Sequence, residues 1–192
     1  KFVPPVTKFS AKCKSKQNKL TWTPVSGADG YIIKYYDYDV IKQEGSFSSE
    51  DSIKIKGGTK NSYTDTNISI NKIRNYDIRA YYEDYNGAKT SYRSAGYISG
   101  TKITSLKNMD NGVKVVVEEK EHVSEYLVYR KAPGETKWKE IGTISSYVRS
   151  YTDRNVKKGN KYYYTVKAVV YKGGTPIYSD YNKNGWSITY NP

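Results

Sequence analysis

Residues 150–168 read SYTDRNVKKGNKYYYTVKA, and residues 62–80, which read SYTDTNISINKIRNYDIRA, are a weaker copy of them. Both copies begin with Ser-Tyr-Thr-Asp and carry a tyrosine, a branched aliphatic residue and an alanine at the same distances further on. Self-similarity of this kind indicates that the two halves of the chain share one structural unit. From Tyr162 to Ala168, residues of alternate character follow one another, and this period of two predicts a strand with one face toward a core. We interpret the Ser-Tyr-Thr-Asp part as a turn before that strand.

The length of the chain suits two small domains. It has 192 residues, and a domain with one core typically has about 100 to 150. We therefore expect one domain at residues 1–100 and a second at residues 101–192. Cys13 is the one cysteine, so no internal disulfide can form, and a domain of this size buries enough surface to fold without one.

Short alternating stretches, separated by turn residues, fill both halves and predict an all-β protein. Besides the strands of the repeat, the first of which runs through Tyr82, they predict strands at residues 5–10, 19–23, 31–36, 52–56, 89–99, 101–107, 113–117, 126–130, 137–142 and 177–190. Asn86-Gly87 and Gly173-Gly174 predict hairpin turns.

Two motifs resemble a known family. Residues 156–162, VKKGNKY, resemble the start of strand F of a fibronectin type III domain, and residues 20–35, LTWTPVSGADGYIIKY, resemble strands B and C with Trp22 as the core tryptophan. The resemblance implies two consecutive immunoglobulin-like β-sandwiches of about seven strands each. It makes residues 52–56 strand E. It also places Val115 of domain 2 where domain 1 has Trp22, and implies that both are buried.

The resemblance further implies a tyrosine corner in domain 2. Tyr162 matches the position whose hydroxyl bonds to upstream backbone, here expected within residues 156–159, and so holds the loop before strand F. Domain 1 has Arg74 at this position. Either Tyr76 takes over the role or domain 1 lacks the corner.

Residue types that carry catalysis are sparse. The chain has one histidine, His122, and one cysteine, Cys13, and neither has a sequence neighbour that completes a pair of nucleophile and base. The adjacent carboxylates of residues 118–119 do not supply the separated acid and base of a glycosidase. Residues 37–39 lack the ligand spacing of a calcium loop. We predict no catalytic residue, no metal site and no cofactor, so any catalytic domain lies outside this segment.

The net charge of +13 and the 22 tyrosines are the main compositional features. Lysines interleaved with aromatic residues can bind glycans, anionic polymers or nucleic acid, because the lysines neutralise anions while the rings stack on sugars or bases. An exposed sheet without a ligand also has this composition, since tyrosine favours strands and lysine guards strand edges. No nucleic-acid-binding motif accompanies the charge, so nucleic acid is not an expected partner.

If the charge serves binding, strand alternation in domain 2 gives the location. Tyr129 and Lys131 leave one strand on the side opposite its core residues, and Tyr163 and Lys167 leave the strand of the repeat in the same way. These strands are neighbours in the family that the chain resembles. The predicted ligand-binding residues are therefore Tyr129, Lys131, Tyr163 and Lys167. A binding module should gather its outward aromatic side chains in one patch, whereas a spacer should scatter them.

The resemblance also implies a role and a location. Tandem domains of this family commonly serve as spacers or accessory modules in secreted or surface-attached bacterial hydrolases, peptidases and wall-associated proteins, and the Lys, Asn, Tyr and Ile content is typical of an AT-rich, Gram-positive-like source. Because the chain starts at Lys1 without Met, we expect a segment of a longer polypeptide whose neighbouring domains are its partners.

The expected function is a non-catalytic spacer or accessory pair of an extracellular bacterial protein. The alternative is a module that binds a glycan or an anionic cell-wall polymer, or an adhesin for a host surface. A monomer is expected. No apolar run in the sequence is long enough to cross a bilayer, so membrane insertion is not expected.

Overall fold

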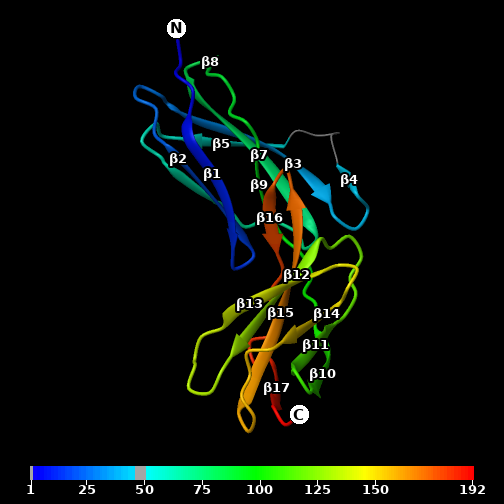
Figure 1. Cartoon of the computed structure of the whole chain (residues 1–192). Coiled ribbons are helices and arrows are strands. Elements are labelled where there is room, and N and C mark those ends of the chain that lie inside the picture. Colours follow the sequence, from blue (N-terminus) through cyan, green and yellow to red (C-terminus); the bar gives the residue numbers. More distant parts are fainter. Residues whose placement is uncertain (1, 46–50) are drawn as a thin grey trace. The chain divides into compact units, whose positions relative to one another are not determined.

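The structure is a computed structural model that describes residues 2–45 and 51–192. The chain forms two compact units, Lys1–Tyr97 and Ile98–Pro192, here called unit 1 and unit 2. Each unit contains two sheets, so four sheets make two β-sandwiches (Figure 1). The described residues contain no helix, and hence none long and apolar enough to cross a membrane. The predicted all-β class with two sandwiches is confirmed.

Unit 1 has one sheet in the order β1-β2-β6, and a second in the order β4-β3-β7-β8, in which β5 also pairs with β3 and β9 with β7. The strands are β1 (Thr7–Lys14), β2 (Gln17–Thr23), β3 (Gly30–Asp39), β4 (Glu44–Gly45), β5 (Asp51–Lys56), β6 (Ser62–Asp65), β7 (Lys72–Tyr82), β8 (Tyr85–Asn86) and β9 (Arg93–Tyr97).

Unit 2 repeats this plan with one sheet in the order β10-β11-β14 and a second in the order β13-β12-β15-β16, in which β17 also pairs with β15. The strands are β10 (Ile103–Met109), β11 (Gly112–Val117), β12 (Glu125–Lys131), β13 (Lys139–Ser145), β14 (Ser150–Asp153), β15 (Lys161–Lys172), β16 (Thr175–Tyr178) and β17 (Trp186–Thr189). The single strand predicted at residues 177–190 is therefore two strands joined by a loop.

The repeat motif contains a strand where a turn was predicted. Ser62–Asp65 forms β6, which pairs with β2, and Ser150–Asp153 forms β14, which pairs with β11. Residues 52–56 were predicted as strand E, but β5 pairs with β3 and so belongs to the other sheet. The strand beside β2 is short and largely polar, which gives it no clear alternation to recognise. The alternation within β5 shows a half-buried strand but not its neighbour.

The hairpin after β7 turns at Glu83 and Asp84, three residues before the predicted Asn86-Gly87, because Tyr82 pairs with Tyr85. The backbone N–H of Glu83 donates to the Asp29 carboxylate at 2.7 Å, which holds the turn at this place. In unit 2, Gly173 and Gly174 form the turn between β15 and β16, as predicted.

Trp22 and Val115 are both buried, but they are not equivalent. Leu20 and Val115 each pair with the tyrosine of the Ser-Tyr-Thr-Asp motif in their own unit, so Val115 corresponds to Leu20. Val117 then takes the place of Trp22. The predicted equivalence is wrong because a shift by two residues along a strand keeps the same face inward, and alternation alone cannot tell the two positions apart.

The tyrosine corner is present in unit 2. Tyr162 is 3% exposed, and its hydroxyl accepts a hydrogen bond from the backbone N–H of Lys157 at 2.9 Å. In unit 1 the hydroxyl of Tyr76 donates to the carboxylate of Asp65 at 2.7 Å instead of bonding to backbone. Tyr76 thus does not replace the corner, and Arg74 stands in the corner position.

A buried carboxylate ties the repeat motif of unit 2 to the opposite sheet. Asp153 accepts hydrogen bonds through Oδ2 from the hydroxyl of Tyr164 at 2.9 Å and from Nη1 of Arg130 at 2.8 Å, and through Oδ1 from the backbone N–H of Asn155 at 3.0 Å. Such charge-assisted bonds offset the cost of burying a carboxylate. Burial, and then the Asp153 carboxylate, raise the pKa of Tyr164 well above its usual value.

Unit 1 has the same arrangement with the arginine on the other strand. Asp65 accepts from Nη1 of Arg74 at 3.0 Å, but Arg74 lies on β7, whereas Arg130 lies on β12. Each guanidinium lies over a tyrosine ring, that of Arg74 over Tyr35 on β3 at 3.9 Å and that of Arg130 over Tyr162 on β15 at 5.4 Å. The arginine and its tyrosine have therefore exchanged strands between the two units.

We expect Tyr162→Phe to lower the free energy of unfolding of unit 2 by about 1–2 kcal/mol, because the N–H of Lys157 loses its acceptor. Urea denaturation followed by the indole NMR resonances of Trp138 and Trp186 measures unit 2 by itself. The control is Tyr163→Phe on the neighbouring, outward position, which should change the free energy by less than about 0.5 kcal/mol. Equal midpoints for the two variants would contradict the role of the corner.

Tyr164 makes stability depend on alkaline pH. Below pH 10, the ordinary pKa of tyrosine, the Tyr164 hydroxyl is protonated in both the folded and the unfolded chain. Above pH 10 the unfolded chain loses the hydroxyl proton while the folded chain keeps it, so the free energy of unfolding falls as the pH rises. We expect Tyr164→Phe to be less stable near neutral pH by about 1.5–3 kcal/mol. Between about pH 9 and 11 it should lose less stability than the parent in urea denaturation. Parallel losses would show that Tyr164 titrates normally.

Candidate ligand-binding face of unit 2

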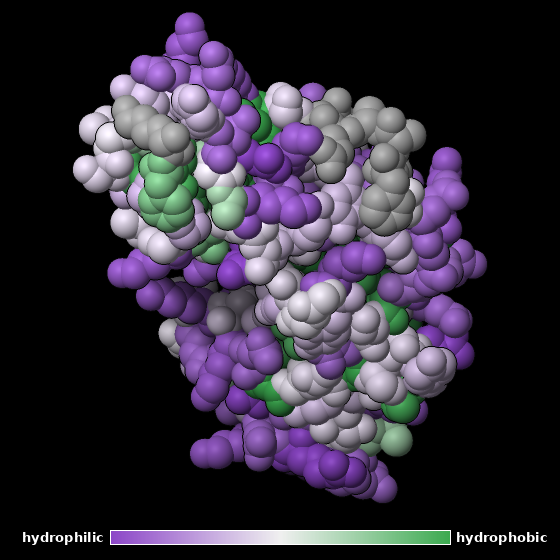
Figure 2. All heavy atoms as spheres, turned by 90° about the horizontal axis from the view of Figure 1, so that it is seen from above, coloured by the Kyte–Doolittle hydropathy of each residue, from purple (hydrophilic) through white to green (hydrophobic). Residues whose placement is uncertain are grey.

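The surface offers no large apolar patch on the side drawn in Figure 2, where hydrophilic side chains predominate and hydrophobic ones appear in small, separate areas. This agrees with the net charge of +13. A candidate site is therefore sought among clusters of charged and aromatic side chains.

The four residues predicted for ligand binding lie on one face of one sheet. Strands β12 and β15 are neighbours, with the pairs Tyr129↔Thr165, Lys131↔Tyr163 and Leu127↔Lys167. Directly paired residues of antiparallel strands point to the same side. The residues between them, such as Val128, Tyr164 and Val166, are buried in the core. The four side chains therefore leave the sheet together on its outer side.

More aromatic rings join this face than the sequence predicted. The ring of Tyr181, from the loop between β16 and β17, stacks on Tyr129 with centroids 5.9 Å apart, and Trp138, from the loop before β13, meets Tyr181 edge-on at 6.3 Å. We call the whole cluster the lysine–aromatic face, and define it as Tyr129, Trp138, Tyr163, Tyr178, Tyr181, Lys131, Lys161 and Lys167.

The ammonium groups of this face lie over its rings. Nζ of Lys131 lies 4.4 Å from the ring centroid of Trp138 and 5.5 Å from that of Tyr163, and Nζ of Lys161 lies 5.3 Å from the centroid of Tyr163. Nζ of Lys167 lies 4.7 Å from the centroid of Tyr181, 5.6 Å from that of Tyr129 and 5.9 Å from that of Tyr178. These are cation–π geometries. Within the described part of the chain, none of the three ammonium groups pairs with a carboxylate. Among the described residues, therefore, no salt bridge neutralises these three charges.

The rings divide into a packed group and an exposed group. Tyr129, Trp138 and Tyr181 are half-buried against one another, whereas Tyr163 and Tyr178 are 37% and 44% exposed. The hydroxyl of Tyr129 bonds to Glu140 at 3.2 Å, and burial followed by that carboxylate raises the pKa of Tyr129 to about 12. Tyr129 is thus neutral at physiological pH.

The loop that carries Tyr181 is fixed across the sheet. The Thr165 hydroxyl donates to the carbonyl oxygen of Asn182 at 2.9 Å, and Oδ1 of Asn182 accepts from the N–H of Asn184 at 3.0 Å. Gly185 closes the loop with a φ of 67° beneath the ring of Trp138. The sequence did not reveal Trp138, Tyr178 or Tyr181 as part of the face. Strands were predicted at residues 137–142 and 177–190, but Trp138 and Tyr181 lie in loops, so alternation could not give the direction of their side chains.

Unit 1 does not carry this cluster at the matching positions. On β3, the unit 1 strand that matches β12, Lys34 replaces Tyr129 and Tyr36 replaces Lys131. On β7, the strand that matches β15, Asn75 replaces Tyr163, Asp77 replaces Thr165 and Arg79 replaces Lys167. Asp77 and Arg79 lie 3.9 Å apart, so the positive charge meets a buried carboxylate. Both units share the same fold and the same overall composition, so composition alone does not explain the face of unit 2.

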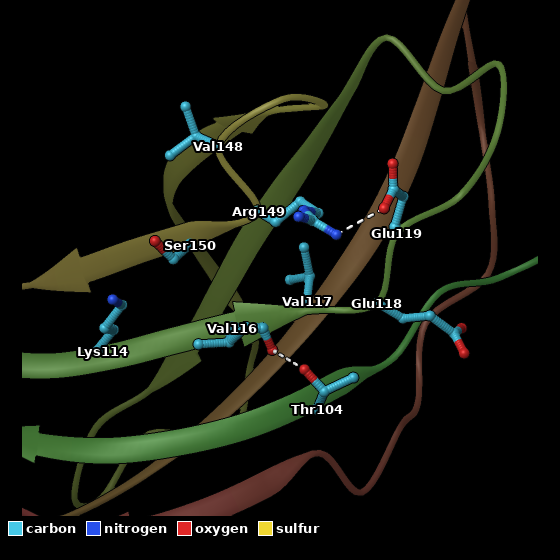
Figure 3. A pocket seen from close by; sticks show the side chains of 9 residues that line it. All are labelled: Thr104, Lys114, Val116, Val117, Glu118, Glu119, Val148, Arg149 and Ser150. Carbon is cyan, nitrogen blue, oxygen red and sulfur yellow. Dashed lines mark hydrogen bonds and ion pairs between the residues drawn. The ribbon is translucent and has the colours of Figure 1, made fainter.

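A second feature of unit 2 is an open hollow on the outer side of its other sheet (Figure 3). It is lined by Thr104, Lys114, Val116, Val117, Glu118, Glu119, Val148, Arg149 and Ser150. Nη1 of Arg149 pairs with Glu119 at 2.6 Å, and Glu118 pairs with Lys102 at 3.3 Å. Because these charges neutralise one another, the hollow is a weaker candidate than the lysine–aromatic face.

The single histidine and the single cysteine of the chain lie in different units. His122 lies exposed in the loop between β11 and β12, and Cys13 lies half-buried on β1. In residues 2–45 and 51–192, no three His, Cys, Asp or Glu side chains form a group able to hold a metal ion.

Comparisons with known proteins support the fold. No protein-family model and no curated protein matches the chain. Among solved structures, the FN1-FN3 domains of chicken CNTN1 match with a TM-score of 0.51 at 14% identity, over 100% of this chain and 67% of that one. A two-domain fibronectin type III segment from chicken tenascin matches with a TM-score of 0.44 at 11% identity, over 97% and 99% of the two chains. An Fn3-like protein from Clostridium thermocellum matches with a TM-score of 0.38 at 21% identity, over 50% and 95%.

The chain therefore has the fold of tandem fibronectin type III domains. Because one fold hosts many roles, the specific role has to be argued from the lysine–aromatic face.

We expect Gly185→Ala to disrupt the lysine–aromatic face. The added Cβ would lie 2.5 Å from Cη2 of Trp138 and 2.6 Å from the carbonyl oxygen of Tyr164. The loop should move and expose Trp138, with a red shift of tryptophan emission and a loss of about 1–3 kcal/mol in the free energy of unfolding. The control is Gly134→Ala, which has a similar φ of 81° but no atom within 4 Å of the added Cβ. An unchanged emission spectrum for Gly185→Ala would contradict the packing of this loop.

Proposed function

We propose that the two units form a non-catalytic accessory pair of a larger extracellular bacterial protein, and that unit 2 attaches this protein to a cell-surface glycan or anionic wall polymer. In this proposal the chain acts as a monomer whose covalent partners are the neighbouring domains of the same polypeptide. Nucleic acid is not a partner.

The observation that carries the binding role is the gathering of rings and ammonium groups on one outer face. Exposed cross-strand pairs that serve stability alone contribute about 0.2–1 kcal/mol each and need no cluster. Here five rings and three lysines from β12, β15, β16 and two loops converge. The rings of Tyr163 and Tyr178 are exposed enough to stack on a ligand.

A spacer role is favoured by the fold alone, since tandem modules of this type separate other domains. It does not account for the difference between the two units. The matching face of unit 1 places Asp77 beside Arg79, whereas unit 2 keeps its ammonium groups without carboxylate partners among the described residues. The binding role accounts for this difference, and it is compatible with spacing.

NMR titration of the isotopically labelled chain with purified bacterial cell-wall polysaccharide at low salt tests the proposal. We expect shifts confined to β12, β15 and the loop of Tyr181. Tyr163→Ala should weaken binding about tenfold, equivalent to about 1.4 kcal/mol, without loss of folding.

The matched control is Tyr85→Ala in unit 1, because Tyr85 is also an exposed strand tyrosine, at 53%. This variant should bind as the parent does. Absence of shifts at millimolar sugar, or shifts spread evenly over both units, would leave the spacer role in place of the binding role.

A further inference from the structure

We infer that the ligand of the lysine–aromatic face is a polyanionic chain that lies along β15 and contacts two separate cationic subsites. This inference rests on the proposed binding role of unit 2 and names the chemistry and the length of the ligand.

The first subsite surrounds Tyr163. The ammonium groups of Lys131 and Lys161 lie 5.5 Å and 5.3 Å from the centroid of this exposed ring. Lys131 also lies 4.4 Å from the centroid of Trp138, which holds its side chain at this end of the face. Two ammonium groups beside one exposed ring can bind an anionic group while the ring stacks on the adjoining part of the ligand.

The second subsite surrounds Lys167. Its ammonium group lies among three rings, 4.7 Å from Tyr181, 5.6 Å from Tyr129 and 5.9 Å from Tyr178. Tyr178 is the exposed ring of this group. The second subsite therefore has one cation and one accessible ring, so it should bind more weakly than the first.

The spacing of the subsites favours a polymer. Tyr163, the ring at the centre of the first subsite, and Lys167 lie on the same strand, four residues apart. A strand rises about 3.3 Å per residue, so their backbones are about 13 Å apart. A single phosphate or monosaccharide can occupy one subsite. A chain that reaches both gains affinity, because binding at the first subsite raises the effective concentration at the second.

The chemistry of the face favours anions over neutral sugars. A neutral glycan is recognised through hydrogen bonds, but the hydroxyl of Tyr129 is already bonded to Glu140 and that of Thr165 to the backbone of Asn182. Besides the hydroxyls of the exposed Tyr163 and Tyr178, the groups left available are three ammonium ions, which have no carboxylate partner in the described residues. Their charge attracts carboxylate or phosphate.

Isothermal titration calorimetry of the whole chain with three polymers tests the chemistry. Polygalacturonate carries carboxylates, poly(glycerol phosphate) carries phosphates, and dextran is neutral. We expect at least one polyanion to bind at least tenfold more tightly than dextran, and its affinity to fall steeply as salt is raised from about 50 to 300 mM. The polyanion that binds more tightly identifies the anion of the natural ligand.

Oligogalacturonates of increasing length, or the corresponding glycerol phosphate oligomers, test the two subsites. The octamer should bind at least tenfold more tightly than the dimer. Lys167→Gln should remove most of this difference with little effect on the dimer, whereas Lys131→Gln should weaken both. The control is Lys54→Gln in unit 1, where the ammonium group also lies over a ring, that of Tyr81 at 4.6 Å. This variant should bind as the parent does.

The outcomes separate the inference from the proposed function. If dextran binds unit 2 as tightly as the polyanions, the face is a glycan site and its anion preference is overturned. If dimer and octamer bind equally, the two-subsite arrangement is overturned while the binding role stands. If no polymer binds, including the purified cell-wall polysaccharide, both the inference and the proposed function fail.

Discussion

The buried aspartate of the repeat motif is the constraint on which both sandwiches depend. A carboxylate removed from water is costly unless charged and polar partners surround it. Asp65 and Asp153 each sit on the short strand of one sheet, and each receives a tyrosine hydroxyl and a guanidinium from the facing sheet. These bonds fix how the two sheets of a unit lie on each other, a restriction that the non-directional packing of apolar side chains imposes less strictly.

The interaction is kept while the residues that make it change places. The arginine comes from β7 in unit 1 and from β12 in unit 2, and in both units it stacks on a tyrosine of the other strand. Where Arg74 occupies the position two residues before the shared tyrosine, no corner tyrosine can stand there. Where the arginine moves to β12, Tyr162 takes the position and bonds to Lys157. The presence of a tyrosine corner and the location of the arginine are thus one structural choice.

How much of the fold and of the candidate site could be predicted from the sequence depends on how clearly each segment alternates. The long strand β15 and its partner β12 alternate clearly, so the all-β class and the outward direction of Tyr163 could be predicted. The corner at Tyr162 was implied by the resemblance to fibronectin type III domains. The strands β6 and β14 have four residues each and little apolar character, and only the bonds of their aspartates show why they are strands. In the candidate site, alternation located Tyr129, Lys131, Tyr163 and Lys167. The rings of Trp138 and Tyr181 arrive from loops, where no periodicity indicates direction.

The outer face of unit 2 combines packed aromatic rings with ammonium groups that form no salt bridge among the described residues. A carboxylate partner would neutralise a lysine, as Asp77 does for Arg79 in unit 1. An aromatic ring instead attracts the ammonium group without removing its charge. The packing of Tyr129, Trp138 and Tyr181 also orders Lys131 and Lys167 before any ligand arrives. Binding then costs less side-chain entropy than it would for free surface lysines. Because the core dictates only the inward residues, each unit can differ on its outer face without change of fold, and a difference in role between the two units should be found there.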